Sequence, residues 1–293
     1  DRRGVAARFT DYNEMLANPE LEAVSVTTMW DQHRAPTLAA LEAGKHVFLE
    51  KPMASSVTDC RAIVDAAKAT DKHFMVGHIV RFQPRYAGAK REIEAGVIGK
   101  IVSIYARRNI PAALGTAVLP KIGPIIGDGV HDTDIMLWYT GAKVETVYAQ
   151  TLDVRGYKYP DIGWTMYRFD SGAIGVCENV WFMPDKVPYF PDERMEIVGT
   201  EGSIHIQETY PSISVIGQEG AYTPDTTYWY EVEPGVRKGA LADELGYFVN
   251  CVLSNTPPTI ITPEESLAAT QACLAAEASA ASGQVVSVQD FND

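Results

Sequence analysis

Residues 34–52 read RAPTLAALEAGKHVFLEKP. Apolar side chains recur at helical spacing over the first ten residues, Gly44 follows them, and residues 46–50 (HVFLE) form an apolar run of strand length. A helix that leads into a buried strand through so short a link is typical of a parallel sheet covered by helices. Lys51 and Pro52 follow directly where this strand ends.

The same alternation continues on both sides of this stretch. Residues 21–28 (LEAVSVTT) predict a strand before it, and residues 56–70 and 72–76 predict a helix and a third strand after it. Strand, helix, strand, helix, strand in this order predicts three parallel strands. Such sheets bind ligands beyond the carboxyl ends of their strands, where Thr28 and Lys51 would lie.

Beyond residue 100 the pattern changes to strands that alternate in polarity, which is typical of an antiparallel or mixed sheet with one solvated face. A bridging helix within residues 81–99, after Pro84 and ending at Gly96 or Gly99, separates the two patterns. We expect strands over residues 101–107, 144–154, 164–169, 173–181, 193–199 and 203–207, and closing helices over residues 239–253 and 263–282. The sequence therefore predicts an α/β chain, with a parallel-sheet domain over residues 1–98 and an α+β domain with a large open mixed sheet over residues 99–293.

The overall charge limits the partners of the chain. The net charge is -13 and the sequence pI is about 4.9, which argues against nucleic acid and anionic membranes because both bind clustered positive charge. No apolar run approaches the roughly 20 residues of a membrane span. The four cysteines lie far apart and form no C-x-x-C pattern. We therefore expect reduced, mostly buried thiols of a cytoplasmic protein, and neither a disulfide framework nor a metal site.

Lys51 is the first candidate for chemistry. A lysine at the end of a buried strand and before a proline has a restricted backbone. Partial desolvation would lower its pKa and make it a better proton donor near neutral pH. The alternative is a solvated lysine in a surface turn, which is the commoner situation for this residue type.

The second candidate is the segment GDGVHDTD, residues 127–134. Asp128 lies between two glycines, where the N-cap of a helix belongs, and His131 would then be the third residue of the first turn, on the same side as Asp134. The positive end of the helix disfavours imidazolium, so His131 would stay neutral and able to accept a proton. The alternative is that Asp128 only caps the helix and His131 is a structural hydrogen-bonding residue.

Other side chains could line a polyol pocket, because sugars bind aromatic faces and charged hydrogen-bond donors. They are Arg81, Tyr105, Tyr157, Tyr159 and Trp164, with His33 as a weaker candidate and Arg107 with Arg108 as a pair able to bind a phosphate group. Tyrosine and tryptophan on a sheet are more often core or interface residues.

These candidates belong to segments that resemble one family across nearly the whole chain. The segments keep the family's order: DYNEMLANPELEAVSV (residues 11–26), AALEAGKHVFLEKPMA (39–54), GHIVRFQPRY (77–86), GVIGK (96–100), GVHDTDIMLWYTG (129–141) and EIVGTEGSIHI (196–206). They are similar to the glucose-fructose oxidoreductase/inositol dehydrogenase/rhizopine-catabolism (GFO/IDH/MocA) family of nicotinamide-dependent oxidoreductases. The resemblance implies a Rossmann domain followed by an α/β domain whose large open sheet often forms the oligomer interface.

The resemblance also implies reversible hydride transfer between NAD or NADP and the hydroxyl of a sugar, polyol or nucleotide-sugar. Lys51 would match the lysine that hydrogen-bonds the reacting oxygen, and His131 the acid/base histidine; with Asp128 they are the expected catalytic residues. We expect the cofactor to contact Thr27, Thr28, Trp30, His33, Glu50, Lys51, Pro52 and Arg81, and the substrate to contact Lys51, Asp128, His131, Arg107, Tyr105, Tyr157 and Trp164. The assembly would be a homodimer or homotetramer built through the C-terminal sheet.

Two departures from the family pattern matter. Many members carry an aspartate four residues before the histidine, where this chain has Gly127, and Asp128 comes one residue late. Asp128 either serves through an altered turn or only caps the helix.

The second departure is at the start of the chain. The family's opening unit of strand, Gly-rich turn, helix and strand, roughly 45–55 residues long, does not precede residues 5–9. We expect this sequence to be a piece of a longer chain, with an unpaired sheet edge beside residues 23–27. The less favoured alternative is a deletion that a swapped partner chain covers.

Two further functions stay open on this fold. Some relatives use tightly held NAD to cleave a glycosidic bond by transient oxidation and elimination, and others sense sugars without turnover. The presence of both Lys51 and His131 favours catalysis.

Overall fold

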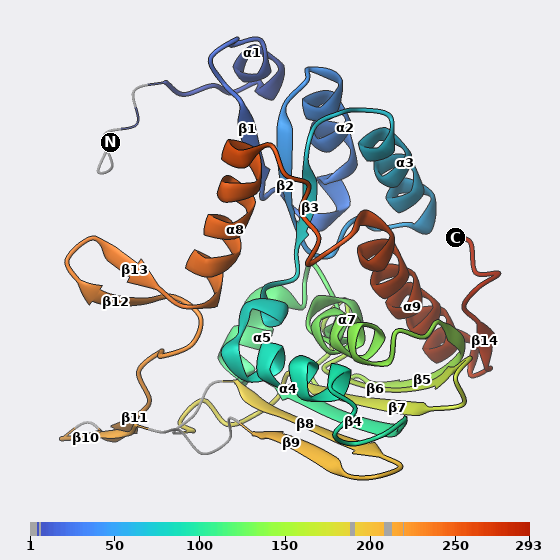
Figure 1. The fold of residues 1–293 in the computed structure, drawn as a ribbon. Helices are drawn as coiled ribbons and strands as arrows, with labels where there is room; N and C mark the ends of the chain where they lie inside the picture. The colour runs from blue at the N-terminus through green and yellow to red at the C-terminus, as the bar shows by residue number, and fades with distance from the viewer. Residues whose placement is uncertain (1–4, 6, 188–190, 208–212, 219) are drawn as a thin grey trace.

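The computed structural model describes residues 5, 7–187, 191–207, 213–218 and 220–293 of the chain. Its N-terminal part contains a three-stranded parallel sheet in the order β1-β2-β3, and a helix connects each strand to the next (Figure 1). The elements of this part are α1 (Tyr12–Leu16), β1 (Ala23–Val26), the 3-10 helix η1 (Trp30–Gln32), α2 (Arg34–Glu42), β2 (His46–Glu50), α3 (Val57–Lys68), β3 (Phe74–Gly77) and the 3-10 helix η2 (Ile79–Phe82). The predicted parallel sheet is confirmed.

The strand β2 is an unbroken apolar run because both of its faces are covered. Val47 and Leu49 pack in the cluster formed with α2 and α3, whereas the Phe48 ring lies 5.7 Å from the Phe248 ring in a second cluster. Phe248 belongs to α8 (Ala240–Ser254), which comes from the far end of the chain and lies along the parallel sheet in Figure 1. Successive side chains of a strand point to opposite faces, so this sheet needs a cover on each side.

The strand β1 lies at one edge of the parallel sheet. In the part of the chain that the structure describes, β1 pairs with β2 alone, and none of residues 5 and 7–9 is in a strand. The expected unpaired edge is therefore present among these residues.

The larger sheet has seven strands in the order β14-β5-β6-β7-β4-β8-β9. Neighbouring strands run antiparallel except β4 and β7, which are parallel, so the predicted mixed sheet is confirmed. Its strands are β4 (Ile101–Asn109), β5 (Val144–Leu152), β6 (Ile162–Phe169), β7 (Ile174–Val180), β8 (Asp192–Gly199), β9 (Ser203–Gln207) and β14 (Val286–Ser287).

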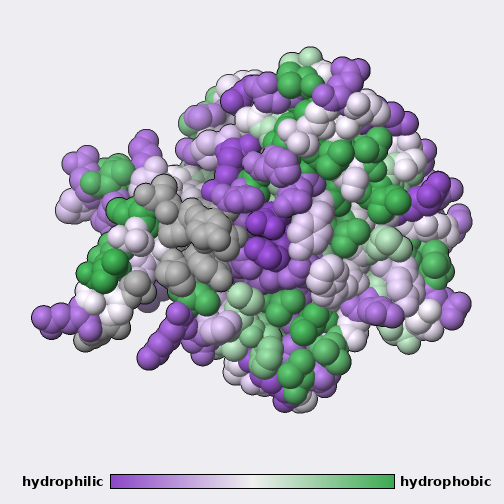
Figure 2. Space-filling view, turned by 90° about the horizontal axis from the view of Figure 1, so that it is seen from below, coloured by the Kyte–Doolittle hydropathy of each residue, from purple (hydrophilic) through white to green (hydrophobic). Residues whose placement is uncertain are grey.

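Two helices, α7 (Gly129–Thr140) and α9 (Pro263–Ser282), cover one face of this sheet (Figure 1). The opposite face is open and carries exposed apolar side chains, namely Trp164, Met166, Ile174 and Val198. Figure 2 views the molecule from this side and shows patches of apolar groups among polar ones. The open face is thus only partly polar.

Several elements differ from the expected ranges. The bridging helix α4 (Pro84–Glu94) begins at Pro84, after η2, as the preference of proline for the first turn of a helix indicates, and it ends two residues before Gly96. The sequence patterns also did not predict several further elements, among them α1 and β14, as well as α5 (Ala112–Val118), α6 (Pro124–Gly127), β10 (Val215–Gly217), β11 (Gly220–Tyr222), β12 (Tyr230–Glu233) and β13 (Val236–Lys238). In Figure 1 the hairpins β10–β11 and β12–β13 extend away from the body. The domain boundary near residue 98 stays a prediction.

The start of α9 follows the sequence closely. Thr262 Oγ1 accepts a hydrogen bond from Glu265 N at 3.2 Å, and Glu265 Oε2 accepts one from Thr262 N at 2.8 Å. This is the capping box that a threonine three residues before a glutamate predicts. Within the described ranges, no helix combines the length and the apolar character needed to cross a bilayer.

Candidate active site

A cavity of about 470 Å³ lies where the carboxyl ends of β1 and β2 meet the start of α7. Its lining residues are Thr28, Met29, Trp30, His33, Glu50, Lys51, Pro52, Arg108, Ile110, Leu114, Val118, Ile122, Gly127, Asp128, His131, Trp181, Pro191 and Tyr228. The ends of parallel strands are where such sheets bind ligands. The cavity therefore unites the two sequence segments that were singled out for chemistry.

Lys51 projects from the end of β2 toward the start of α7. Its Nζ donates a hydrogen bond to the Gly127 carbonyl oxygen at 2.7 Å, while its backbone N–H donates to Glu50 Oε2 at 3.1 Å. Desolvation lowers the pKa of Lys51, and Arg108 lowers it further, whereas the negative charges of Asp128 and Glu50 raise it. Lys51 is thus a desolvated amine that donates to a carbonyl oxygen, and its pKa is influenced by the negative charges of Asp128 and Glu50.

His131 is the third residue of α7, as its spacing from Asp128 predicts. Its side chain is 8% exposed and lines the cavity, and Nδ1 has no hydrogen-bond partner among the described residues. Burial lowers the pKa of His131 well below the ordinary value, and the positive charges of Lys51 and Arg108 add to this. The ring is therefore neutral near pH 7 and able to accept a proton.

Asp128 does not act as the helix cap that its position suggests. It has helical backbone angles and its side chain makes no capping hydrogen bond to α7. Its Oδ2 instead accepts a hydrogen bond from Trp181 Nε1 at 2.8 Å, and the carboxylate lines the cavity with Lys51. Of the two alternatives for Asp128, the structure contradicts the one in which it only caps the helix, and the carboxylate lies among the other candidates for chemistry.

Arg108, and not Arg107, lines the cavity. Along β4, Ile104, Ala106 and Arg108 face α7, where Arg108 Nε and Nη2 donate to Asp132 at 3.1 and 3.0 Å. Arg108 Nη1 also donates to Glu193 Oε2 at 3.1 Å. Burial nevertheless raises the pKa of Asp132 to about 6. The cation is fixed at the edge of the cavity by two buried carboxylates.

The remaining expected substrate contacts lie outside the cavity. Arg107 and Tyr105 point to the open face of the sheet, because neighbours along a strand alternate between faces; Arg107 Nη2 pairs with Asp192 at 2.9 Å, and the Tyr105 hydroxyl donates to Glu178. Trp164 is 44% exposed on this same face.

The loop aromatics do not reach the cavity either. The Tyr157 hydroxyl donates to Thr116 at 3.2 Å, and Tyr157 and Tyr159 pack against the cluster of Ile110, Leu119 and Trp181 behind the cavity wall. The expectation that Tyr157 contacts the substrate is therefore not met.

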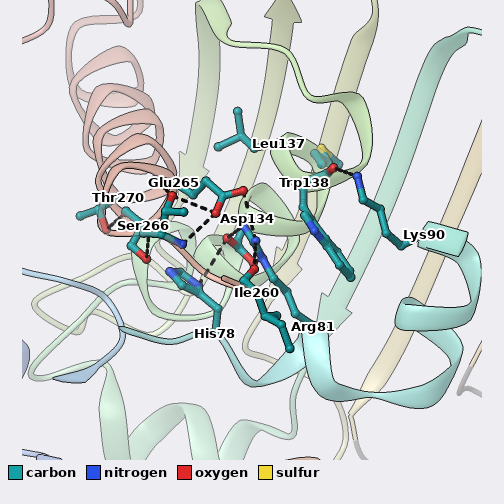
Figure 3. A network of polar contacts seen from close by, with 12 residues as sticks. His78, Arg81, Lys90, Asp134, Leu137, Trp138, Ile260, Glu265, Ser266 and Thr270 are labelled. Atoms are coloured by element: carbon teal, nitrogen blue, oxygen red, sulfur yellow. Dashed lines mark hydrogen bonds and ion pairs between the residues drawn. The ribbon is translucent and has the colours of Figure 1, made fainter. Parts of the chain in front are cut away.

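Arg81 is committed to an internal ion pair and does not line the cavity (Figure 3). Its Nε and Nη2 donate to the two oxygens of Asp134 at 2.8 and 2.7 Å, and its Nη1 donates to the Ile260 carbonyl oxygen at 2.6 Å. Glu265 lies 3.3 Å from the same guanidinium, and His78 Nδ1 lies 3.8 Å from Asp134. The expected cofactor contact of Arg81 is therefore not met, because its guanidinium is buried and is held by Asp134 of α7, by the Ile260 carbonyl oxygen and by Glu265 of α9.

The other expected cofactor contacts form one wall of the cavity. Thr28, Trp30, His33, Glu50 and Pro52 line it, whereas Thr27 does not. The two ring nitrogens of His33 lie 2.9 Å from the Pro52 carbonyl oxygen and 3.0 Å from the Thr28 carbonyl oxygen. The His33 ring thereby bridges the turn after β1 and the turn after β2.

Among the lining residues that sequence reasoning missed, Trp181, Tyr228 and Pro191 come from the later part of the chain. They lie more than 40 residues from the Asp128–His131 segment, and only the fold brings them to it. Within the described part of the chain, no three His, Cys, Asp or Glu side chains gather as a metal site would require. All four cysteines are buried and unpaired.

Comparisons with known proteins agree with this geometry. Residues 2–78 match the model described as "Oxidoreductase family, NAD-binding Rossmann fold", and residues 86–205 match the "GFO/IDH/MocA C-terminal domain". The chain is 31% identical over 268 residues to scyllo-inositol 2-dehydrogenase (NAD(+)) from Bacillus subtilis, covering 88% of this chain and 75% of that protein. It is 27% identical over 267 residues to myo-inositol 2-dehydrogenase from Thermotoga maritima, covering 89% and 78%.

Solved structures give the same result. The structure of apo scyllo-inositol dehydrogenase from Lactobacillus casei superimposes with a TM-score of 0.79 at 25% identity, over 96% of this chain and 83% of that one. Both halves of the chain match one family, in the expected order and with the expected fold. The chain therefore belongs to the GFO/IDH/MocA family of NAD-binding oxidoreductases.

Proposed function

We propose that the protein transfers a hydride between NAD and a ring hydroxyl of a cyclic polyol of the inositol class. The observation that carries this proposal is the convergence of Lys51, Asp128 and His131 on one cavity at the carboxyl ends of β1 and β2. The inositol dehydrogenases among the relatives support the substrate class. NAD is favoured over NADP by the description of the matching family model.

The wall beside β1 and β2 fits the nicotinamide end of the cofactor. Trp30 and Pro52 offer flat apolar surfaces, and Thr28 and Glu50 offer polar groups at the strand ends, all of them around the same cavity. When bound, NAD supplies the hydride acceptor. The chain itself has to orient the carbinol and remove its proton.

The protein groups divide this work according to their charges. Neutral His131 accepts the proton of the reacting hydroxyl. Lys51 donates a hydrogen bond to the same oxygen, and its positive charge stabilises the negative charge that develops there as the proton leaves. The hydride departs from the carbon while the proton departs from the oxygen, so the substrate becomes a ketone. Asp128 favours the protonated form of Lys51, because its negative charge raises the pKa of that amine against the effect of desolvation.

A polyol panel that includes scyllo- and myo-inositol, followed by NADH absorbance, tests this function. Lys51→Met and His131→Asn should each lower kcat by at least about 100-fold, the usual contribution of an acid/base group. Lys143→Met, a change at an exposed lysine, serves as the matched control. Full turnover in both active-site variants would refute the mechanism, and a sugar leaving group released without net NADH would point to the elimination reaction instead.

We also propose that the protein forms a homodimer or homotetramer through the open face of the larger sheet. The exposed apolar side chains Trp164, Met166, Ile174 and Val198 support this, because monomers rarely leave such a face uncovered. Met166→Lys should lower the mass measured by light scattering, and an unchanged mass would contradict this interface. The unpaired buried cysteines support a cytoplasmic location.

A further inference from the structure

Trp181 stands between the candidate site and α5, and its backbone is fixed on both sides. Its N–H donates to the Asp161 carbonyl oxygen at 2.9 Å, and its carbonyl oxygen accepts from Arg155 Nη2 at 2.7 Å. The side chain is 2% exposed and packs with Ile110 and Leu119. The indole is therefore a rigid group with one edge turned to the cavity.

That edge lies directly against Gly127. A Cβ atom at position 127 would come within 2.6 Å of Trp181 Cη2 and 2.9 Å of Cζ2, closer than real Cβ contacts. The carbonyl oxygen of the same Gly127 accepts the hydrogen bond from Lys51 Nζ at 2.7 Å. The ring of Trp181 thus bounds the position of the carbonyl group that holds Lys51.

The indole N–H holds the next residue as well. An aspartate at the start of a helix normally turns its carboxylate to the N–H groups of the first turn, but Asp128 makes no such bond. Its Oδ2 accepts from Trp181 Nε1 at 2.8 Å, and its carboxylate faces the cavity near Lys51. The hydrogen bond from Trp181 competes with helix capping for this carboxylate.

We propose that Trp181 is a positioning residue of the reaction: it holds the Asp128 carboxylate and the Gly127 carbonyl group together beside the Lys51 ammonium group. The catalytic meaning of this proposal rests on the proposed function. The contacts of Trp181 with Gly127 and Asp128 can be tested whether or not the protein turns over a polyol. Both partners come from consecutive residues, so one indole ring sets both. Loss of the indole N–H frees Asp128 to cap α7, and Lys51 then loses a neighbouring negative charge.

The direct test is the pH dependence of Lys51 acetylation by acetic anhydride in the full chain, without cofactor or substrate, read by peptide mass spectrometry. Only the neutral amine reacts, so the pH at which the acetylation rate reaches half of its maximum reports the Lys51 pKa. This pH is called the midpoint below. Trp181→Phe should lower this midpoint by about 1 pH unit, as expected for removal of a nearby opposite charge. Asp128→Asn should lower it as well, and Trp181→Phe should add a clearly smaller shift in the Asp128→Asn background, where only its contact with Gly127 is left to lose. Trp164→Phe, on the open face, should leave the midpoint unchanged.

The double mutant separates positioning from simple packing. An unchanged midpoint in Trp181→Phe, or an equal further shift in the Asp128→Asn background, would overturn the proposal. If Trp181→Phe does not fold, Gly127→Ala gives a second test, because its methyl group displaces the ring while leaving the indole N–H present. Gly127→Ala should also lower the midpoint, and no change there would equally overturn the proposal. Because labelling needs no turnover, a failed polyol panel would leave this result readable.

Discussion

Replacing Arg81 with leucine should strongly destabilise the fold, because it leaves Asp134 as a buried carboxylate without its cation. Asp134 is 1% exposed and receives two hydrogen bonds from Arg81, at 2.8 and 2.7 Å. Removal of one partner from such a buried pair costs about 3–5 kcal/mol. The change also removes the donor at 2.6 Å from the Ile260 carbonyl oxygen, so we expect the upper part of this range.

Urea unfolding of the wild type, Arg81→Leu and Arg81→Leu/Asp134→Leu measures the effect. The double variant should recover about half of the loss or more, because no unpaired charge remains in it.

Arg168→Leu is the matched control, because its ion pair with Glu145 is 60% and 56% exposed at the two side chains. It should cost less than about 1 kcal/mol. A loss below about 1 kcal/mol in Arg81→Leu, or a double variant less stable than the single one, would refute the assignment of Arg81 to structure. A selective increase of the KM for NAD in Arg81→Lys, with unchanged stability, would return it to the cofactor site.

Three further predictions concern the buried titratable groups and the two faces of β4. Lys51→Met should raise the pKa of His131, because the Lys51 charge helps to lower it, and a histidine NMR titration would show this. Burial raises the pKa of Glu277 to about 7, so its ionisation weakens the fold as pH rises from about 4.3 to 7. Glu277→Gln should therefore stabilise the protein at pH 8, by up to about 3 kcal/mol in urea unfolding, and should have little effect at pH 4. Arg108→Gln should lower kcat/KM by at least about tenfold, whereas Arg107→Gln, on the opposite face of β4, should change it by less than about twofold.

The elements could be predicted where the signals are local. β2 (His46–Glu50) coincides with its apolar run, and the capping box at Thr262 marks the start of α9. α5 (Ala112–Val118) was missed because its sequence, AALGTAV, has no charged face and contains a glycine. Its helix is held from outside by Arg155, which donates to the Ala112 carbonyl oxygen at 3.0 Å.

The site could be predicted only in part, because side-chain direction depends on distant partners. Lys51 lies in the cavity because it follows the end of β2, and His131 lies there because it belongs to the first turn of α7. Arg107 and Arg108 are neighbours in sequence, and only the register of β4 in the sheet decides which one meets α7. The direction of Asp128 is decided by Trp181, 53 residues away, and no local pattern contains that information.

The packing of α8 on the parallel sheet has a consequence for synthesis of the chain. Phe48 and its partner Phe248 are separated by about 200 residues, and at roughly 5–20 residues per second the ribosome needs about 10–40 s to make the stretch between them. During this interval the apolar face of the parallel sheet that later packs against α8 is exposed to solvent, where chaperones or neighbouring chains can bind it. A nonsense mutation ahead of α8 would therefore expose the first-made part of the protein to aggregation and proteolysis, rather than leaving it as a working fragment.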